Sequence, residues 1–220
     1  EVPSQKATVQ SDRVKVWTAA ELGAFLKRSE AEADRDFAAW RVAASTGMRR
    51  GEVLGLRWCD IDLDAGTLTT VQAVTVVNHA ITVGVLKTDS SERTIALDDR
   101  TVAAIRSHRA RRAQERMLLG LGQAAPTDLV FSEPTGEPLH PEALSKRFDR
   151  RARRYGLPHI GVHGLRHTWA TLALRSGVHP RVVQQRLGHS TIAVTLGIYS
   201  HVTDGMDLGA AQQVAALFDA

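Results

Sequence analysis

The stretch LGHSTIAVTLGIYSH, residues 187–201, contains two histidines and Tyr199, one of only two tyrosines in the 220-residue chain. A tyrosine phenol has a pKa of about 10, so it is a useful nucleophile only where neighbouring groups take its proton or stabilise the phenolate. Imidazole titrates near neutral pH and is suited to take that proton. The stretch therefore predicts a catalytic tyrosine, provided that the chain also supplies cationic partners.

Two other polar clusters supply such partners: TGMRRGEVLGL, residues 46–56, and HGLRHT, residues 163–168. Guanidinium groups stay protonated and can present parallel N–H donors to a phosphate. Arg49 and Arg166 form the natural phosphate clamp, with the adjacent Arg50 as a chemically identical alternative to Arg49. His163 and Arg166 lie three residues apart on a predicted helix, near an N-terminus whose free N–H groups favour a phosphate.

Arg, His-x-x-Arg, Leu-Gly-His and Tyr, in this order, resemble the catalytic domain of the tyrosine recombinases, the phage integrase family, over residues 16–202. Each motif alone occurs by chance in a chain of this length, but together and in order they are specific. The resemblance implies an α+β, mainly helical fold related to that of type IB topoisomerases, with a small antiparallel β-sheet. It also implies DNA recombination or integration for a phage or other mobile element, through a 3′-phosphotyrosyl intermediate with Tyr199 as nucleophile.

The resemblance also assigns roles to individual residues. It selects Arg49 over Arg50, gives His163 the role of proton acceptor or phosphate assistant, and has His189 donate a hydrogen bond to the scissile phosphate. The basic 5′-oxygen that leaves requires a proton donor. Lys87, at a predicted hairpin turn in the segment LKTDSSERTI (residues 86–95), resembles the general-acid lysine of the family.

Two further residues have supporting roles. Glu52 follows Arg49 by three residues and can orient it on a helix. His201, two residues after Tyr199, is either an orienting group or an ordinary polar neighbour. The implied chemistry needs no metal, cofactor or ATP.

Composition is compatible with an acidic polymer as partner. The net charge is only +4, but basic residues cluster at 106–116 and 146–154. The lone Cys59 excludes an intramolecular disulfide and a Cys-rich zinc site, and fits a reducing cytoplasm. The resemblance implies that this is the cytoplasm of a bacterial host cell. No stretch has the apolar length of a transmembrane helix, so no membrane partner is expected. The resemblance implies double-stranded DNA attachment or core sites, a tetramer assembled on DNA, and accessory DNA-bending proteins.

The expected domain organisation has three parts. Residues 1–15 are polar and read as a linker from a missing N-terminal core-DNA-binding domain, and residues 16–202 form the catalytic domain. Residues 203–220 carry an apolar stripe at helical spacing, which predicts a C-terminal helix that docks within the chain or is exchanged between protomers.

The expected elements follow from local signals. Thr18 and Glu21 form a capping box before a first helix, and a second helix buries Phe37, Trp40 and Ala44 before it stops at Gly47. Strands are expected at 68–76, 81–86 and 94–97, and helices at 99–117 and 141–155. From residue 163 onward the chain is expected to be helical, with breaks at 177, 180 and 188–190.

The sequence is also compared with the patterns of three other functions. A helix-turn-helix module over residues 179–199 would only bind DNA, but leaves the arginine and lysine motifs unexplained. His163 and His167 have the spacing of zinc ligands on a helix, yet Gly164 stands where a zinc hydrolase needs its glutamate. A type IB topoisomerase uses similar chemistry.

The chain departs from the family pattern at two positions: Gly164 stands where the family commonly has Asp, and Cys59 follows Leu-Arg-Trp. These small departures remove no catalytic group.

Overall fold

A computed structural model describes residues 15–86, 92–203 and 215–216, and for residues 198–203 the backbone alone is described. Lys87 and the apolar stripe expected at 208–218, except for Ala215, lie outside the described residues. The elements in chain order are α1 (Ala19–Ala31), α2 (Phe37–Thr46), α3 (Arg50–Gly55), a 3-10 turn η1 (Trp58–Asp60), β1 (Ile61–Asp62), β2 (Thr67–Thr70), β3 (Gln72–Val77), β4 (Ala80–Val85), β5 (Arg93–Ala96), α4 (Asp99–Leu118), α5 (Pro141–Arg154), α6 (Gly161–Arg175), α7 (Pro180–Leu187) and α8 (Ile192–Thr203).

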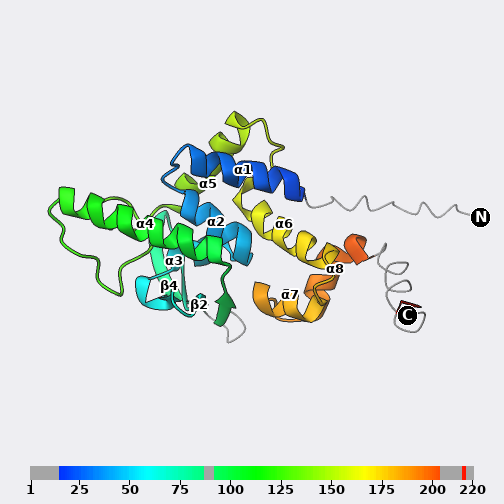
Figure 1. Cartoon of the computed structure of the whole chain (residues 1–220). Helices are drawn as coiled ribbons and strands as arrows, with labels where there is room; N and C mark the ends of the chain where they lie inside the picture. The colour runs from blue at the N-terminus through cyan, green and yellow to red at the C-terminus, as the bar shows by residue number, and fades with distance from the viewer. Residues whose placement is uncertain (1–14, 87–91, 204–214, 217–220) are drawn as a thin grey trace, which may run out of the picture.

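The α+β, mainly helical fold predicted from the sequence is confirmed (Figure 1). The predicted capping box is present at α1, where the Thr18 hydroxyl accepts from the Glu21 N–H at 3.2 Å and the Glu21 carboxylate accepts from the Thr18 N–H at 2.7 Å. Pro141 begins α5, and Gly156 follows its end at a φ of 72°. Local signals therefore placed these helix boundaries correctly.

The main core is built around an aromatic cluster. Trp17, Phe25, Trp40 and Phe148 are each at most 1% exposed, and the ring centroids of the pairs in contact lie 5.1–6.4 Å apart. They come from the segment before α1 and from α1, α2 and α5. Such aromatic contacts contribute beyond the burial of apolar area. This cluster anchors the N-terminal end of the described chain to α5.

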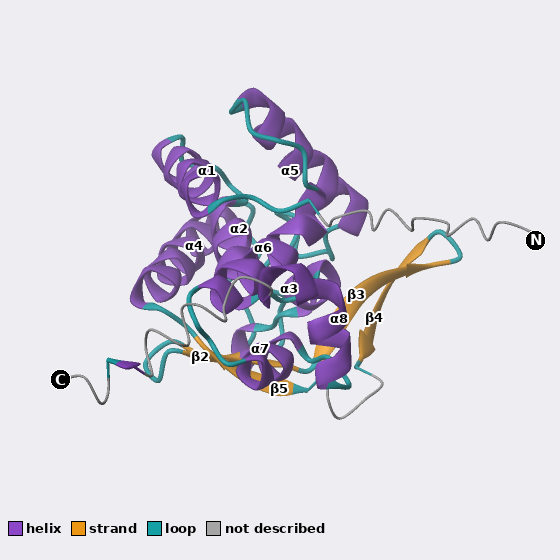
Figure 2. Ribbon diagram, turned by 90° about the vertical axis from the view of Figure 1, so that its right-hand side faces the viewer, coloured by secondary structure: helices purple, strands orange, loops and turns teal. Residues whose placement is uncertain are grey.

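The β structure differs from the single small sheet that was expected. β1, β2 and β5 form a three-stranded antiparallel sheet, whereas β3 and β4 form a separate hairpin that extends away from the helices (Figure 2). The strand expected at 68–76 is split at Val71, because β3 turns to lie against α3. At this contact a Cβ added at Gly51 or Gly55 would lie 2.6 Å from a carbonyl oxygen of β3. Because glycine has no Cβ, the backbones of α3 and β3 can lie this close together.

The last three helices form a second packing unit. The predicted breaks separate α6, α7 and α8, and α7 ends at Gly188 with a φ of 65°. A small cluster joins α6 to α7: Ala170, Leu174, Val183 and Leu187. Helical spacing predicts that Leu165, Trp169 and Leu172 share the buried face of α6, opposite His163 and Arg166. Leu165 is buried, but Trp169 and Leu172 are only half-buried, so this prediction was partly wrong. Ala170 and Leu174 face α7 instead.

Candidate active site

Arg49 is placed by the turn between α2 and α3. Gly47 ends α2 with a φ of 70°, Met48 is buried, and Arg49 is the extended residue that precedes α3. The left-handed conformation favours glycine, and a Cβ at Gly47 would lie 2.7 Å from Leu187 Cδ2 and 3.0 Å from Trp169 Cε3. The Gly-Met-Arg motif is thus a close-packed turn that holds Arg49 against α7.

The two adjacent arginines point to different partners. Arg49 donates to Glu52 Oε1 at 2.7 Å and to the Gly188 carbonyl at 3.3 Å, and its side chain is 43% exposed. Arg50 donates to the Ser145 hydroxyl of α5 at 2.6 Å. Only Arg49 of the two contacts the loop that carries His189. The choice of Arg49 as the catalytic arginine stays a prediction.

Arg166 is buried, with 3% of its surface exposed. Its Nη1 donates to the Gly47 carbonyl and its Nη2 to the Leu187 carbonyl, both at 2.8 Å. One guanidinium therefore joins the end of α2 to the end of α7. The Gly47 carbonyl lies two residues before Arg49, and the Leu187 carbonyl precedes the Gly188 carbonyl that accepts from Arg49. The two predicted clamp arginines are therefore held by the same two segments, the turn after α2 and the end of α7.

The histidines lie around these arginines. His163 is in the first turn of α6, and its ring meets that of His167 edge-on at 4.7 Å. His189 follows α7 and is 8% exposed; its Nδ1 lies 2.8 Å from the Thr195 hydroxyl of α8, and Gln184 donates to its backbone carbonyl at 2.6 Å. His189 thus joins α7 to the helix that carries Tyr199.

Lost hydration, followed by the neighbouring charges, lowers the pKa of all three imidazoles. Lost hydration and then the Arg166 charge lower the pKa of His189 to about 4. Lost hydration and then the His163 ring lower the pKa of His167 to about 4. Lost hydration at the cleft wall, followed by the charges of Arg166 and Arg49, also lowers the pKa of His163. At neutral pH, permanently charged guanidiniums are therefore surrounded by imidazoles that can accept a proton.

A cleft of about 680 Å³ opens beside Arg49. Its wall includes Arg50, His163, Thr75 and Leu86, contributed by α3, α6, β3 and the end of the β4 segment. Leu86 is the residue before Lys87. Tyr199 and His201 lie on α8, which packs against α6 and α7, but their side chains are outside the described part of the chain.

Arg93, the first residue of β5, was not identified from the sequence. Its side chain is 9% exposed, and both of its terminal nitrogens contact the Glu52 carboxylate, at 2.9 and 3.4 Å. Glu52 is itself 2% exposed. An arginine at the start of a short strand carries no local sign of a buried partner 41 residues away. Its position in the segment 86–95, which also carries Lys87, was the available signal.

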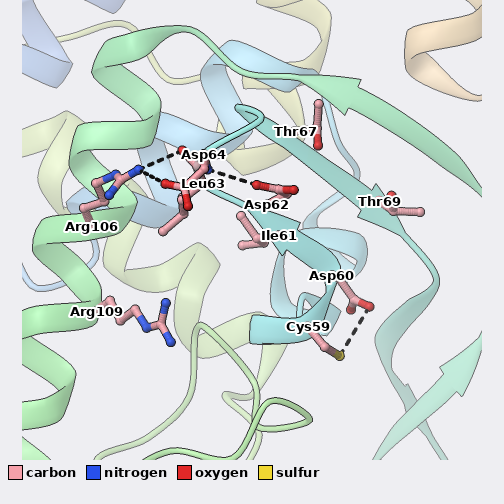
Figure 3. A pocket seen from close by; sticks show the side chains of 10 residues that line it. All are labelled: Cys59, Asp60, Ile61, Asp62, Leu63, Asp64, Thr67, Thr69, Arg106 and Arg109. Carbon is pink, nitrogen blue, oxygen red and sulfur yellow. Dashed lines mark hydrogen bonds and ion pairs between the residues drawn. The ribbon is translucent and has the colours of Figure 1, made fainter.

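A second cleft, of about 560 Å³, lies between β1, β2 and α4 and contains none of the predicted site residues (Figure 3). Its carboxylates have partners: Asp64 accepts from Arg106 at 2.6 Å, and Asp60 accepts from Arg57 at 2.7 Å. Asp62 accepts from the backbone N–H groups of residues 64 and 65. These contacts account for the acidic side chains around this cleft.

In the described part of the chain, no helix is long and apolar enough to cross a membrane.

The sequence matches the model of the phage integrase family over residues 15–206, so the chain belongs to that family, the tyrosine recombinases. It is 30% identical to a tyrosine recombinase XerC-like protein of Caldanaerobacter subterraneus subsp. tengcongensis, over 80% of this chain and 48% of that protein.

The chain is also 32% identical to a putative prophage phiRv2 integrase of Mycobacterium tuberculosis, over 80% of this chain and 44% of that protein. The chain spans about half the length of the curated relatives it matches. Its fold is similar to that of the Tn1549 transposon integrase in complex with transposon right end DNA, with a TM-score of 0.78 and 20% identity, over 96% of this chain and 68% of that one. The predicted catalytic fold is thereby confirmed.

Proposed function

We propose that the chain is the catalytic part of a site-specific DNA recombinase that cuts and rejoins DNA through a 3′-phosphotyrosyl intermediate. The observation that carries this proposal is the convergence of Arg49, Arg166 and His189 at the end of α7, next to the helix that bears Tyr199. Family membership supports the same chemistry.

In the proposed step, Tyr199 Oη forms a bond to phosphorus and the bond from phosphorus to the 5′-oxygen breaks. The phenol proton goes to His163, and the 5′-oxygen takes a proton from Lys87. One phosphodiester bond replaces another, so no ATP is consumed. A 5′-hydroxyl from a partner duplex reverses the step and exchanges strands, and no metal is needed where fixed cations meet the phosphate charge.

The arginines stabilise the charge that accumulates on the non-bridging oxygens in the pentacoordinate transition state. A pre-positioned donor of this kind contributes about 10²–10³-fold to the rate. Arg49 is suited to this because its exposed guanidinium is already oriented by Glu52. His189, with Nδ1 at the Thr195 hydroxyl, has Nε2 left to contact the phosphate as the proposed hydrogen-bond donor.

The proposed partners follow from the chemistry. Double-stranded attachment or core sites are the substrate, and exchange between two duplexes requires four strand cleavages, hence four tyrosines and a tetramer on DNA. Accessory DNA-bending proteins belong to the same proposal, as does a location in the cytoplasm of a bacterial host, where the DNA is. Residues 1–15 then act as a linker to a core-binding domain, 16–202 as the catalytic domain, and 203–220 as a helix that is exchanged between protomers.

The test is denaturing capture of protein–DNA adducts from a pool of nicked duplexes, followed by sequencing of the attached DNA. Tyr199→Phe removes the nucleophile and is expected to abolish adducts while DNA affinity is retained. Tyr155→Phe is the matched control, because the Tyr155 hydroxyl donates to Glu32 at 2.9 Å beside α1, away from the site. Wild type and the control are expected to carry DNA 3′ ends, with or without chelator.

Each other outcome contradicts a part of the proposal. Adducts from Tyr199→Phe would identify a different nucleophile, and loss of adducts in chelator would point to a metal. Relaxation of supercoiled DNA without strand exchange would favour the topoisomerase alternative. Wild type that binds DNA without any adduct would favour a DNA-binding relative.

A further inference from the structure

Three consecutive carbonyls at the end of α7 each accept a hydrogen bond from a different arginine. The Arg186 carbonyl accepts from Arg93 Nε at 2.6 Å, the Leu187 carbonyl from Arg166 at 2.8 Å, and the Gly188 carbonyl from Arg49 at 3.3 Å. The last carbonyls of a helix have no partner within it, and that end carries partial negative charge. The end of α7 is therefore where these three cations converge.

Arg93 differs from the other two in what its remaining nitrogens contact. Its side chain is 9% exposed, and it donates to both oxygens of Glu52 and to the Thr70 hydroxyl at 3.3 Å. Arg49, whose side chain is 43% exposed, contacts the same carboxylate at 2.7 Å. Glu52 thus accepts from two guanidiniums, that of Arg93, whose side chain is 9% exposed, and that of Arg49, which lines the cleft.

The balance of charge makes Arg93 the main partner of Glu52. Burial raises the pKa of this carboxyl, but the hydrogen bonds and charge of Arg93, followed by those of Arg49, lower it below its ordinary value. Arg93, Glu52 and Arg49 together carry one net positive charge. Without Arg93, the charges of Glu52 and Arg49 cancel, and the positive charge of Arg49 is then taken up by the Glu52 carboxylate.

We infer that Arg93 is a positioning residue of the active site: it holds Glu52 and the end of α7, and so leaves the charge of Arg49 available to the scissile phosphate. The inference rests on the proposed function. Arg93 acts through Arg49 and does not itself touch the substrate. Its loss is therefore expected to slow cleavage by about tenfold to a hundredfold, less than the 10²–10³-fold effect of losing a direct donor.

The experiment measures single-turnover adduct formation by the full chain at saturating concentrations of the captured duplex. Wild type, Arg93→Lys and Arg93→Met are compared on two substrates, one with a normal scissile phosphate and one with a methylphosphonate, which has no charge at phosphorus. A charge effect exerted through Arg49 predicts a large defect on the phosphate and a defect within about threefold of wild type on the methylphosphonate. Equal defects on both substrates would indicate only a structural role and would overturn the inference.

A double variant keeps the test independent of any folding defect caused by an uncompensated Glu52. Glu52→Gln combined with Arg93→Met removes both charges and restores one net positive charge at Arg49. Part of the rate lost in Arg93→Met is therefore expected to return, whereas additive losses would contradict the inference. Thermal unfolding of each variant is followed alongside.

The matched control is Arg57→Met. The Arg57 guanidinium also makes two contacts with one carboxylate, at 2.7 and 2.9 Å to Asp60, whose side chain is 6% exposed, but Arg57 lies next to η1, outside the site. Its cleavage rate is expected to equal that of wild type. If wild type forms adducts and Arg93→Met forms them equally fast, the Arg93 inference alone fails. If wild type forms none, the proposed function fails and the inference fails with it.

Discussion

Substitution of Gly47 by alanine tests whether the turn before Arg49 is held by close packing. The backbone φ of 70° costs alanine roughly 1–2 kcal/mol. The new methyl group would lie 2.7 Å from Leu187 Cδ2 and 3.0 Å from Trp169 Cε3, and overpacking of this kind costs about 1–3 kcal/mol. The lower entropy of the unfolded alanine chain offsets about 0.4–1 kcal/mol. The net expected loss in the free energy of unfolding is about 1–5 kcal/mol, with a midpoint of about 3 kcal/mol.

Two other glycines separate these contributions. Gly156 has nearly the same φ, 72°, but no heavy atom within 4 Å of a Cβ, so Gly156→Ala reports the backbone strain less the same entropic offset, about 1 kcal/mol in all. Gly23 lies inside α1 with open space around it, so Gly23→Ala is expected to stabilise by about 0.5–1 kcal/mol. Urea unfolding of the three variants gives the comparison.

The adduct assay adds a functional readout. Because the Gly47 carbonyl accepts from Arg166, displacement of this turn is expected to lower the cleavage rate in Gly47→Ala and leave it unchanged in Gly156→Ala. Equal losses of stability in these two variants would refute the argument that contact with Leu187 and Trp169 holds the turn.

Arg166→Lys keeps the charge but cannot reach both the Gly47 and Leu187 carbonyls, so cleavage is expected to fall by about 10²–10³-fold in single-turnover assays, and a near-normal rate would contradict the clamp. Lys87→Ala is expected to cleave slowly, and to recover on a substrate with a bridging 5′-sulfur, whose thiolate leaves without a proton; no recovery would remove Lys87 as the general acid. Burial lowers the pKa of His108 to about 4. Between pH of about 6.5 and 4 the unfolded chain therefore binds a proton that the native chain does not. The free energy of unfolding is expected to fall by about 3 kcal/mol as the pH is lowered through this range. His108→Gln should lose that part of the slope in urea titrations. The lowered pKa of His163 predicts that cleavage is retained below pH of about 6.5 and declines only as His163 becomes protonated, which a pH–rate profile of wild type and His163→Gln measures.

Most of the helical framework could be predicted from the sequence, because its signals are local. The capping box at Thr18, the proline that begins α5 and the glycine that ends α7 act within a few residues of themselves. The order of the arginine, histidine and tyrosine motifs was likewise sufficient to predict the family and its fold. The roles of the individual site residues stay predictions.

The strands were less predictable. The run from Leu68 to Val76 has uniform β-forming character, and nothing within it marks the division at Val71 into two sheets. That division depends on α3, because a Cβ added at Gly51 or Gly55 would lie 2.6 Å from a carbonyl oxygen of β3. Contact between elements therefore decided where one strand ended and the next began.

The assembly of the site was decided by tertiary structure for a related reason. The sequence by itself determined which side chains could donate to a phosphate and which of them share a helix. It did not indicate that Arg93, Arg166 and Arg49 meet at the end of α7, because their acceptors there are main-chain carbonyls. Every residue type carries such a carbonyl, so only the position of the helix end in the folded chain makes these three acceptors distinct.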